Sequence, residues 1–121
     1  TLTEMKGDFL KVVLEDVADN LFNPDPYYQQ GGDMVRVGAL DYRIAPMADA
    51  GNRITGMAIA GQDIDPSRTY KVAGWASVQQ VEGEPVWDVV ARWLRAKKTI
   101  DTLEVNQPQV LGISDNAGLA I

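Results

Sequence analysis

The stretch FLKVVLEDVADNLF, Phe9–Phe22, carries the clearest pattern in the sequence. Its apolar side chains recur three or four residues apart, which places them on one face of an α-helix. These side chains are Leu10, Val13, Leu14, Val17, Ala18 and Leu21. Because Pro24 and Pro26 follow and cannot continue a helix, we predict that the helix ends near Phe22 and packs its apolar stripe against a core.

Extended segments follow this helix. Alternating apolar and polar residues predict short strands over Met34–Val37 and Leu40–Ala45, and a less regular strand over Asn52–Ala60. The run Thr69–Ser77 is rich in β-branched and aromatic residues, as strands are.

A second amphipathic helix is predicted to begin near Pro85, since proline is well tolerated in a first helical turn. Its apolar stripe includes Trp93, which we expect in the core, whereas Trp87 lies off the stripe. Two main helices among several strands predict an α+β fold with a mixed or largely antiparallel sheet.

The composition fits one acidic globular domain of 121 residues, with 11 basic and 17 acidic side chains and a net charge of −6. We therefore expect no nucleic-acid partner and no membrane partner, and no apolar run approaches the roughly 20 residues that span a bilayer. We treat residues 1–121 as a single domain with a tail from about 114 to 121. Because the sequence begins at Thr1, we expect it to be a piece of a longer polypeptide.

Acidic pairs suggest metal binding only weakly. Glu15, Asp16 and Asp19 lie close together on the first helix, but helix spacing supplies too few converging oxygens for a hard cation. We expect a solvated helix face there. Asp63 and Asp65 lack the glycine and glutamate positions of a calcium loop, so we expect a turn. The chain has no histidine and no cysteine, and we predict no metal site in it.

The loop NPDPYYQQGGD, residues 23–33, and the following MVRVG hold the more interesting candidates. A glycine pair lets backbone approach a ligand closely, and Arg36 could hold an anion with two N–H groups. The simpler interpretation is a bend before an edge strand with an exposed arginine, and the residues alone favour it. For Trp87, a ligand wall and local packing are equally supported.

Three stretches resemble the C-terminal domain of the 5′-nucleotidase family. They are MKGDFLKVVLE (5–15), GDMVRVGALD (32–41) and GNRITGMAIAGQDIDPSRTYKVAG (51–74), and the resemblance spans about residues 1–95. Within that family, LEDVADNLFNPDPYYQQGGDMVRVGALDY (14–42), TYKVAGWASV (69–78) and EPVWDVVARWLR (84–95) are similar to the thiosulfohydrolases of sulfur oxidation.

This resemblance implies a role within a periplasmic hydrolase that uses two manganese ions. Such enzymes release sulfate from a sulfonated sulfur chain on a cysteine of the carrier protein SoxYZ. Their metal ligands belong to an N-terminal metallophosphoesterase domain that this sequence lacks. The resemblance therefore implies a substrate-pocket and carrier-docking domain with no catalytic residue and no cofactor of its own, inactive in isolation.

The resemblance also implies a set of substrate-binding residues. Met34 takes the place of an aromatic that stacks on the base in nucleotidases, and Arg36 takes the place of a glutamine. Losing the aromatic argues against a nucleotide, and a guanidinium suits a sulfonate. Trp87 falls near a second aromatic position. The expected substrate-binding residues are Tyr27, Tyr28, Gly32, Asp33, Met34, Arg36 and Trp87.

Two alternatives stay open at this point. The chain could be the C-terminal substrate-binding domain of a nucleotidase or related phosphoesterase that acts on nucleotides. It could instead be a stand-alone binding or interaction module, although the Thr1 start argues against an independent protein.

Overall fold

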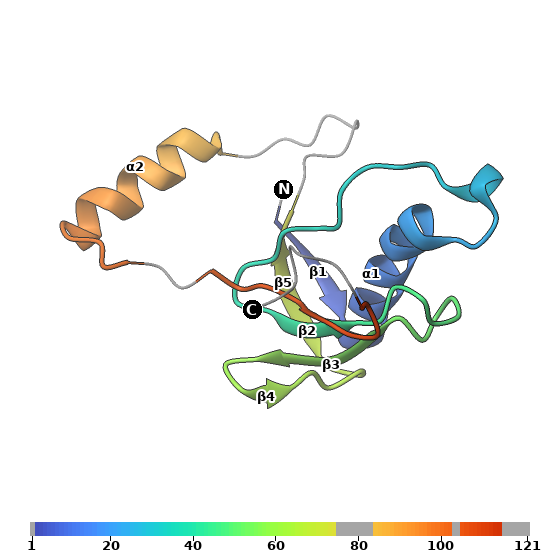
Figure 1. Cartoon of the computed structure of the whole chain (residues 1–121). Helices are drawn as coiled ribbons and strands as arrows, with labels where there is room; N and C mark the ends of the chain where they lie inside the picture. The colour runs from blue at the N-terminus through green and yellow to red at the C-terminus, as the bar shows by residue number, and fades with distance from the viewer. Residues whose placement is uncertain (1, 75–83, 103–104, 115–121) are drawn as a thin grey trace. The chain divides into compact units, whose positions relative to one another are not determined.

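The computed structural model describes residues 2–74, 84–102 and 105–114 (Figure 1). The two predicted helices are present among short strands, so the α+β class is confirmed. In chain order the elements are β1 (Leu2–Lys6), α1 (Gly7–Phe22), the 3₁₀ turn η1 (Pro26–Tyr28), β2 (Asp41–Ile44), β3 (Ile54–Ile59), β4 (Gln62–Asp63), β5 (Thr69–Ala73), α2 (Val86–Lys97) and β6 (Gln109–Val110).

The strands form two sheets in the described part of the chain. Four strands are ordered β4-β3-β2-β6, and β1 pairs with β5. In the larger sheet β3 is antiparallel to both β2 and β4, whereas β6 is parallel to β2, so the predicted mixed sheet is confirmed. The chain divides into a smaller compact unit, residues 1–4 and 71–105, and a larger one, residues 5–70 and 106–121.

The core of the larger unit lies between α1 and the strands β2 and β3. Leu14 and Ala18 from the predicted helix stripe are buried with Tyr42, Ile44 and Ile54. In β2 the side chains alternate between exposed and buried, as expected for a strand with one face on a core. The predicted helix is therefore confirmed, together with the side that it buries.

The start of α1 is fixed by a turn far along the chain. The N–H of Gly7 donates to the carbonyl of Arg68 at 3.1 Å, and that of Asp8 donates to the carbonyl of Pro66 at 3.0 Å. A Cβ on Gly7 would overlap the carbonyl oxygen of Asp65, so only glycine fits here. The Asp65 carboxylate accepts from the backbone and hydroxyl of Ser67, which confirms the predicted turn at Asp65. For Asp63 the prediction is wrong, because this residue pairs with Ala58 in β4.

The predicted strand over Met34–Val37 is wrong, because this segment is irregular. Met34, Val35 and Val37 are all partly buried against the core, so the side chains do not alternate between a buried and an exposed face. The flanking backbone also leaves the extended region, with φ of 105° at Gly32 and 62° at Ala39. The Ala39 N–H donates to the side chain of Asn106 at 2.7 Å rather than to a strand.

The second helix forms as predicted, with Pro85 as its N-cap residue. Its apolar stripe is exposed, however, and the expectation that Trp93 belongs to the core is wrong, since this side chain is 45% exposed. Periodicity predicts which side chains share a helix face, but it does not predict what covers that face. No described helix is long and apolar enough to span a membrane. Residues 75–77 of the predicted strand and the tail from 115 lie outside the described residues.

Candidate functional site

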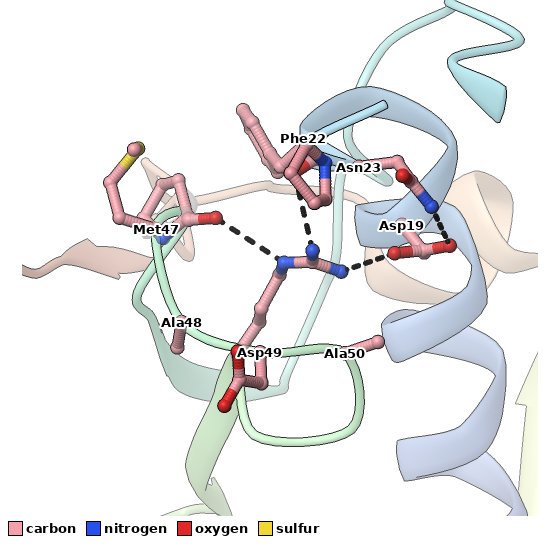
Figure 2. Close-up of a pocket in the computed structure, with 10 residues that line it drawn as sticks. Asp19, Phe22, Asn23, Met47, Ala48, Asp49 and Ala50 are labelled. Carbon is pink, nitrogen blue, oxygen red and sulfur yellow. Dashed lines mark hydrogen bonds and ion pairs between the residues drawn. The ribbon is translucent and has the colours of Figure 1, made fainter. Parts of the chain in front are cut away.

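A buried arginine joins the end of α1 to the turn between β2 and β3 (Figure 2). Arg53 is 1% exposed, and its guanidinium donates from all three nitrogens. Nη1 donates to Oδ1 of Asp19 at 2.6 Å, Nη2 to the Phe22 carbonyl at 3.2 Å and Nε to the Pro46 carbonyl at 3.2 Å. A buried charge is tolerated only when it is paired and hydrogen-bonded, and Arg53 meets both conditions.

Glu15 organises the same turn through its carboxylate. It is 8% exposed and accepts backbone N–H groups from Gly51 at 3.0 Å, Arg53 at 3.3 Å and Ile54 at 2.8 Å. The expectation of a solvated acidic helix face is therefore wrong for Glu15. The carboxylate is buried because three backbone donors replace its water.

Asp19 completes the junction on the helix side. Hydrogen bonds from Arg53 and then from Asn23 lower the pKa of the Asp19 carboxyl below its ordinary value of 3.8, and burial opposes that change. The Asn23 amide donates to Oδ2 at 2.9 Å, so each carboxylate oxygen has a partner. We call Arg53, Asp19 and Asn23 the junction relay.

A cavity of about 390 Å³ opens beside this relay. Figure 2 shows side chains from the end of α1 on one side and from the 46–50 turn on the other. The two charged side chains Arg53 and Asp19, which line this cavity, already bind each other and neighbouring groups. The lining residues are Asp19, Phe22, Asn23, Pro24, Pro46, Met47, Ala48, Asp49, Ala50 and Arg53. This cavity therefore does not present converging, unsatisfied polar groups to a ligand.

The two predicted tyrosines lie in η1, just after α1. Asp25 accepts the N–H of Tyr27 at 2.9 Å and so caps this turn. The rings of Tyr27 and Tyr28 meet edge to face, with centroids 5.4 Å apart, and are 86% and 60% exposed. They form an aromatic surface that no described side chain covers.

Four of the remaining predicted residues follow η1 along the chain, whereas Trp87 lies on α2. Gly32, Asp33 and Arg36 are exposed, and Arg36 has no hydrogen bond or ion pair among the described residues. Met34 is half-buried against the core. We call residues 25–36 the candidate segment. Trp87 is 69% exposed on α2 in the smaller unit, so its grouping with the others stays a prediction.

No metal site emerges from these residues. No group of three or more His, Cys, Asp or Glu side chains in the described ranges is arranged to hold a metal ion. The acidic residues nearest to such a role, Glu15 and Asp19, bind backbone N–H groups and other side chains. The carboxylates of the described ranges therefore do not form a manganese centre.

The fold and the motifs place the chain in a known family. The family model described as 5′-nucleotidase, C-terminal domain, matches residues 1–92, and the chain belongs to this family. Among solved structures it is similar to the sulfate thiohydrolase SoxB of Thermus thermophilus in complex with glycerol. The two are 33% identical with a TM-score of 0.72, over 95% of this chain and 23% of that one.

A second solved structure shares the fold. It is described as a 5′-nucleotidase from Staphylococcus aureus in complex with alpha-ketoglutarate, at 17% identity and a TM-score of 0.57. That match covers 90% of this chain and 26% of the other, so the chain spans about a quarter of both proteins. No curated protein matches the sequence.

Proposed function

We propose that this chain is the substrate-pocket and carrier-docking domain of a thiosulfohydrolase. The enzyme would release sulfate from a cysteine-bound sulfonate on the carrier protein SoxYZ, in the periplasm. The observation that carries this proposal is the likeness to SoxB, at 33% identity over 95% of the chain. The likeness to the nucleotidase structure, at 17% identity, speaks for the fold alone.

We infer from the family resemblance that two domains share the work of this enzyme. Residues 1–121 would form one C-terminal domain of a longer two-domain metallohydrolase. An N-terminal metallophosphoesterase domain would hold two manganese ions, which activate water for attack on the sulfonate sulfur. This chain has no histidine and no cysteine, and its described carboxylates do not gather into a metal site. The isolated chain is therefore proposed to be inactive.

Arg36 is the proposed sulfonate-binding residue. Its guanidinium presents parallel N–H groups that match two oxygens of a sulfonate, and it has no partner among the described residues that would compete. Gly32, with φ of 105°, has no Cβ to keep a ligand from the backbone beside Asp33 and Met34. Tyr27 and Tyr28 offer apolar surface to the carrier's arm. Trp87 is included on the family resemblance alone.

The alternative is the C-terminal substrate-binding domain of a 5′-nucleotidase or related phosphoesterase, which the family match supports by itself. The position of Met34 weighs against it. Where the resemblance expects a base-stacking aromatic, this chain has a thioether half-buried against the core. It offers no π-face for a nucleobase.

The test uses the full-length protein with manganese, supplied either with sulfonated SoxYZ or with AMP. Sulfate release from the carrier and no phosphate from AMP is the expected result. Phosphate from AMP without sulfate release would return the chain to the nucleotidases. Assaying the two domains separately would show which part carries the chemistry, with no turnover expected from this chain alone.

Arg36→Ala tests the sulfonate contact within that assay. Losing a charge-assisted hydrogen bond of about 1.5–3 kcal/mol should lower kcat/KM by roughly 10- to 100-fold. Arg43→Ala is the matched control, because Arg43 is an exposed arginine of β2 that also has no ion pair among the described residues. Equal kinetics for the two variants would remove Arg36 from the proposed site.

A further inference from the structure

The candidate segment leaves α1 where the junction relay ends, and a series of hydrogen bonds connects the two. Arg53 fixes Asp19, and the other oxygen of Asp19 accepts from the Asn23 amide at 2.9 Å. Oδ1 of Asn23 in turn accepts the N–H of Asp25 at 3.0 Å, which is the residue that caps the tyrosine turn. The buried charge and the exposed tyrosines are therefore linked through one asparagine side chain.

Two further bonds hold the middle of the segment against the end of the helix. The Gln29 side chain donates to the Asn23 carbonyl at 2.7 Å, and the Gly31 N–H donates to the Asn20 carbonyl at 3.2 Å. Both carbonyls belong to the last turn of α1 or follow it directly. The Gln29 side chain and the Gly31 N–H thus tie the middle of this segment to the helix end.

We propose that Asn23 is a positioning residue for substrate binding, and that Arg53 and Asp19 hold it in place. The proposal rests on the proposed function. The relay fixes the direction in which the chain leaves α1 and thereby orders Tyr27, Tyr28 and the glycine pair before substrate arrives. Ordering a binding segment in advance lowers the entropy cost of binding, so its effect belongs in KM.

Asn23→Ala tests this role without removing the buried charges. The Arg53–Asp19 pair and the core remain, whereas the bonds to Asp19 and to the Asp25 N–H are lost. Loss of these two hydrogen bonds should raise KM for sulfonated carrier about tenfold, with kcat changed less than twofold. A purely structural defect would do the reverse, because a smaller folded fraction lowers the apparent kcat and leaves KM unchanged.

Amide hydrogen exchange on the same full-length protein gives a readout independent of turnover. In Asn23→Ala the N–H groups of Tyr27 and Gly31 should exchange about tenfold faster, and that of Ile54 at the original rate. Asn52→Ala is the matched control, because Asn52 is exposed and its side chain makes no hydrogen bond among the described residues. It should change neither KM nor exchange.

Asn23→Ser provides the rescue, because it leaves the Arg53–Asp19 pair intact. A serine hydroxyl can donate to Asp19 and accept the Asp25 N–H, so slower exchange at Gly31 should return at least in part. Unchanged exchange and unchanged KM in Asn23→Ala would overturn the positioning role. If the unmodified protein releases no sulfate from the carrier, the proposed function fails, and the exchange result alone decides whether the relay orders this segment.

Discussion

Arg53 and Arg36 lie in the same compact unit but in opposite environments. Arg53 is 1% exposed and binds one carboxylate and two carbonyls, whereas Arg36 is exposed and has no partner among the described residues. Arg53 is buried and already paired with a carboxylate, so its guanidinium is not accessible to a substrate anion. The comparison therefore separates an arginine that holds the fold together from one that is available to a ligand.

The largest expected difference between the two arginines is in their contribution to stability. Arg53→Ala should lower the free energy of unfolding by about 3–5 kcal/mol, because it removes a buried side chain with its bond to the partly exposed Asp19 and leaves two carbonyls without their donor. Arg36→Ala should stay within about 0.5 kcal/mol of the original protein, as exposed substitutions usually do. Urea denaturation followed by circular dichroism measures both. Similar midpoints for the two variants would contradict the contrast.

Substitution of Glu15 should give the next largest loss of stability, and two variants separate the effect of its hydrogen bonds from that of its charge. Glu15→Ala leaves the N–H groups of Gly51, Arg53 and Ile54 without their acceptor and should cost about 3 kcal/mol or more. Glu15→Gln keeps one acceptor oxygen, so it should lie between Glu15→Ala and the original protein. If Glu15→Gln were as unstable as Glu15→Ala, the negative charge would matter more than the hydrogen bonds.

The Asp19 carboxyl makes the junction sensitive to acid. Its pKa is lowered in the folded protein, chiefly by the hydrogen bond from Arg53, so its ionised form favours folding. That contribution is complete above its ordinary value of 3.8 and is lost as the pH falls through the lower folded value. Unfolding free energies measured between pH 7 and pH 2 should fall at the acid end. Asp19→Asn should reduce the slope of this fall, whereas a slope equal to that of the original protein would assign the acid sensitivity to other carboxyls.

The sequence predicted what depends on local pattern. The stripe of α1 and the alternation around Tyr42 and Ile44 lie in regular elements, where spacing alone assigns side chains to a face. It failed at Met34–Val37, because three of these side chains pack on the core and the nearby Ala39 N–H binds Asn106, 67 residues away along the chain. No local pattern contains such a contact.

The residues of the site likewise fall into those that the sequence indicated and those that only the folded structure showed. The family resemblance predicted the substrate-binding residues of the candidate segment, which stay a prediction, whereas the roles of Glu15 and Arg53 were missed. The available signal was a charged residue directly before the apolar strand β3, in NRITG. A charge at such a place has to be paired if it is buried, and its partner could only be found once α1 was packed beside the strand.

The smallest effect is expected at Tyr42, which completes the contrast between buried polar groups with and without partners. Tyr42 is 3% exposed, its hydroxyl has no hydrogen-bond partner in the part of the chain that the structure describes, and burial raises its pKa. Because Tyr42→Phe removes a polar atom that gains nothing in the folded state, stability should be unchanged or rise by up to about 1 kcal/mol. Tyr42→Leu should instead lose about 2 kcal/mol or more, since it removes part of the packed ring. Urea midpoints distinguish the cases. A loss above about 1 kcal/mol in Tyr42→Phe would mean that a bound water accepts from the hydroxyl. The core would then depend on paired polar groups at Tyr42 as well as at the junction of Glu15 and Arg53.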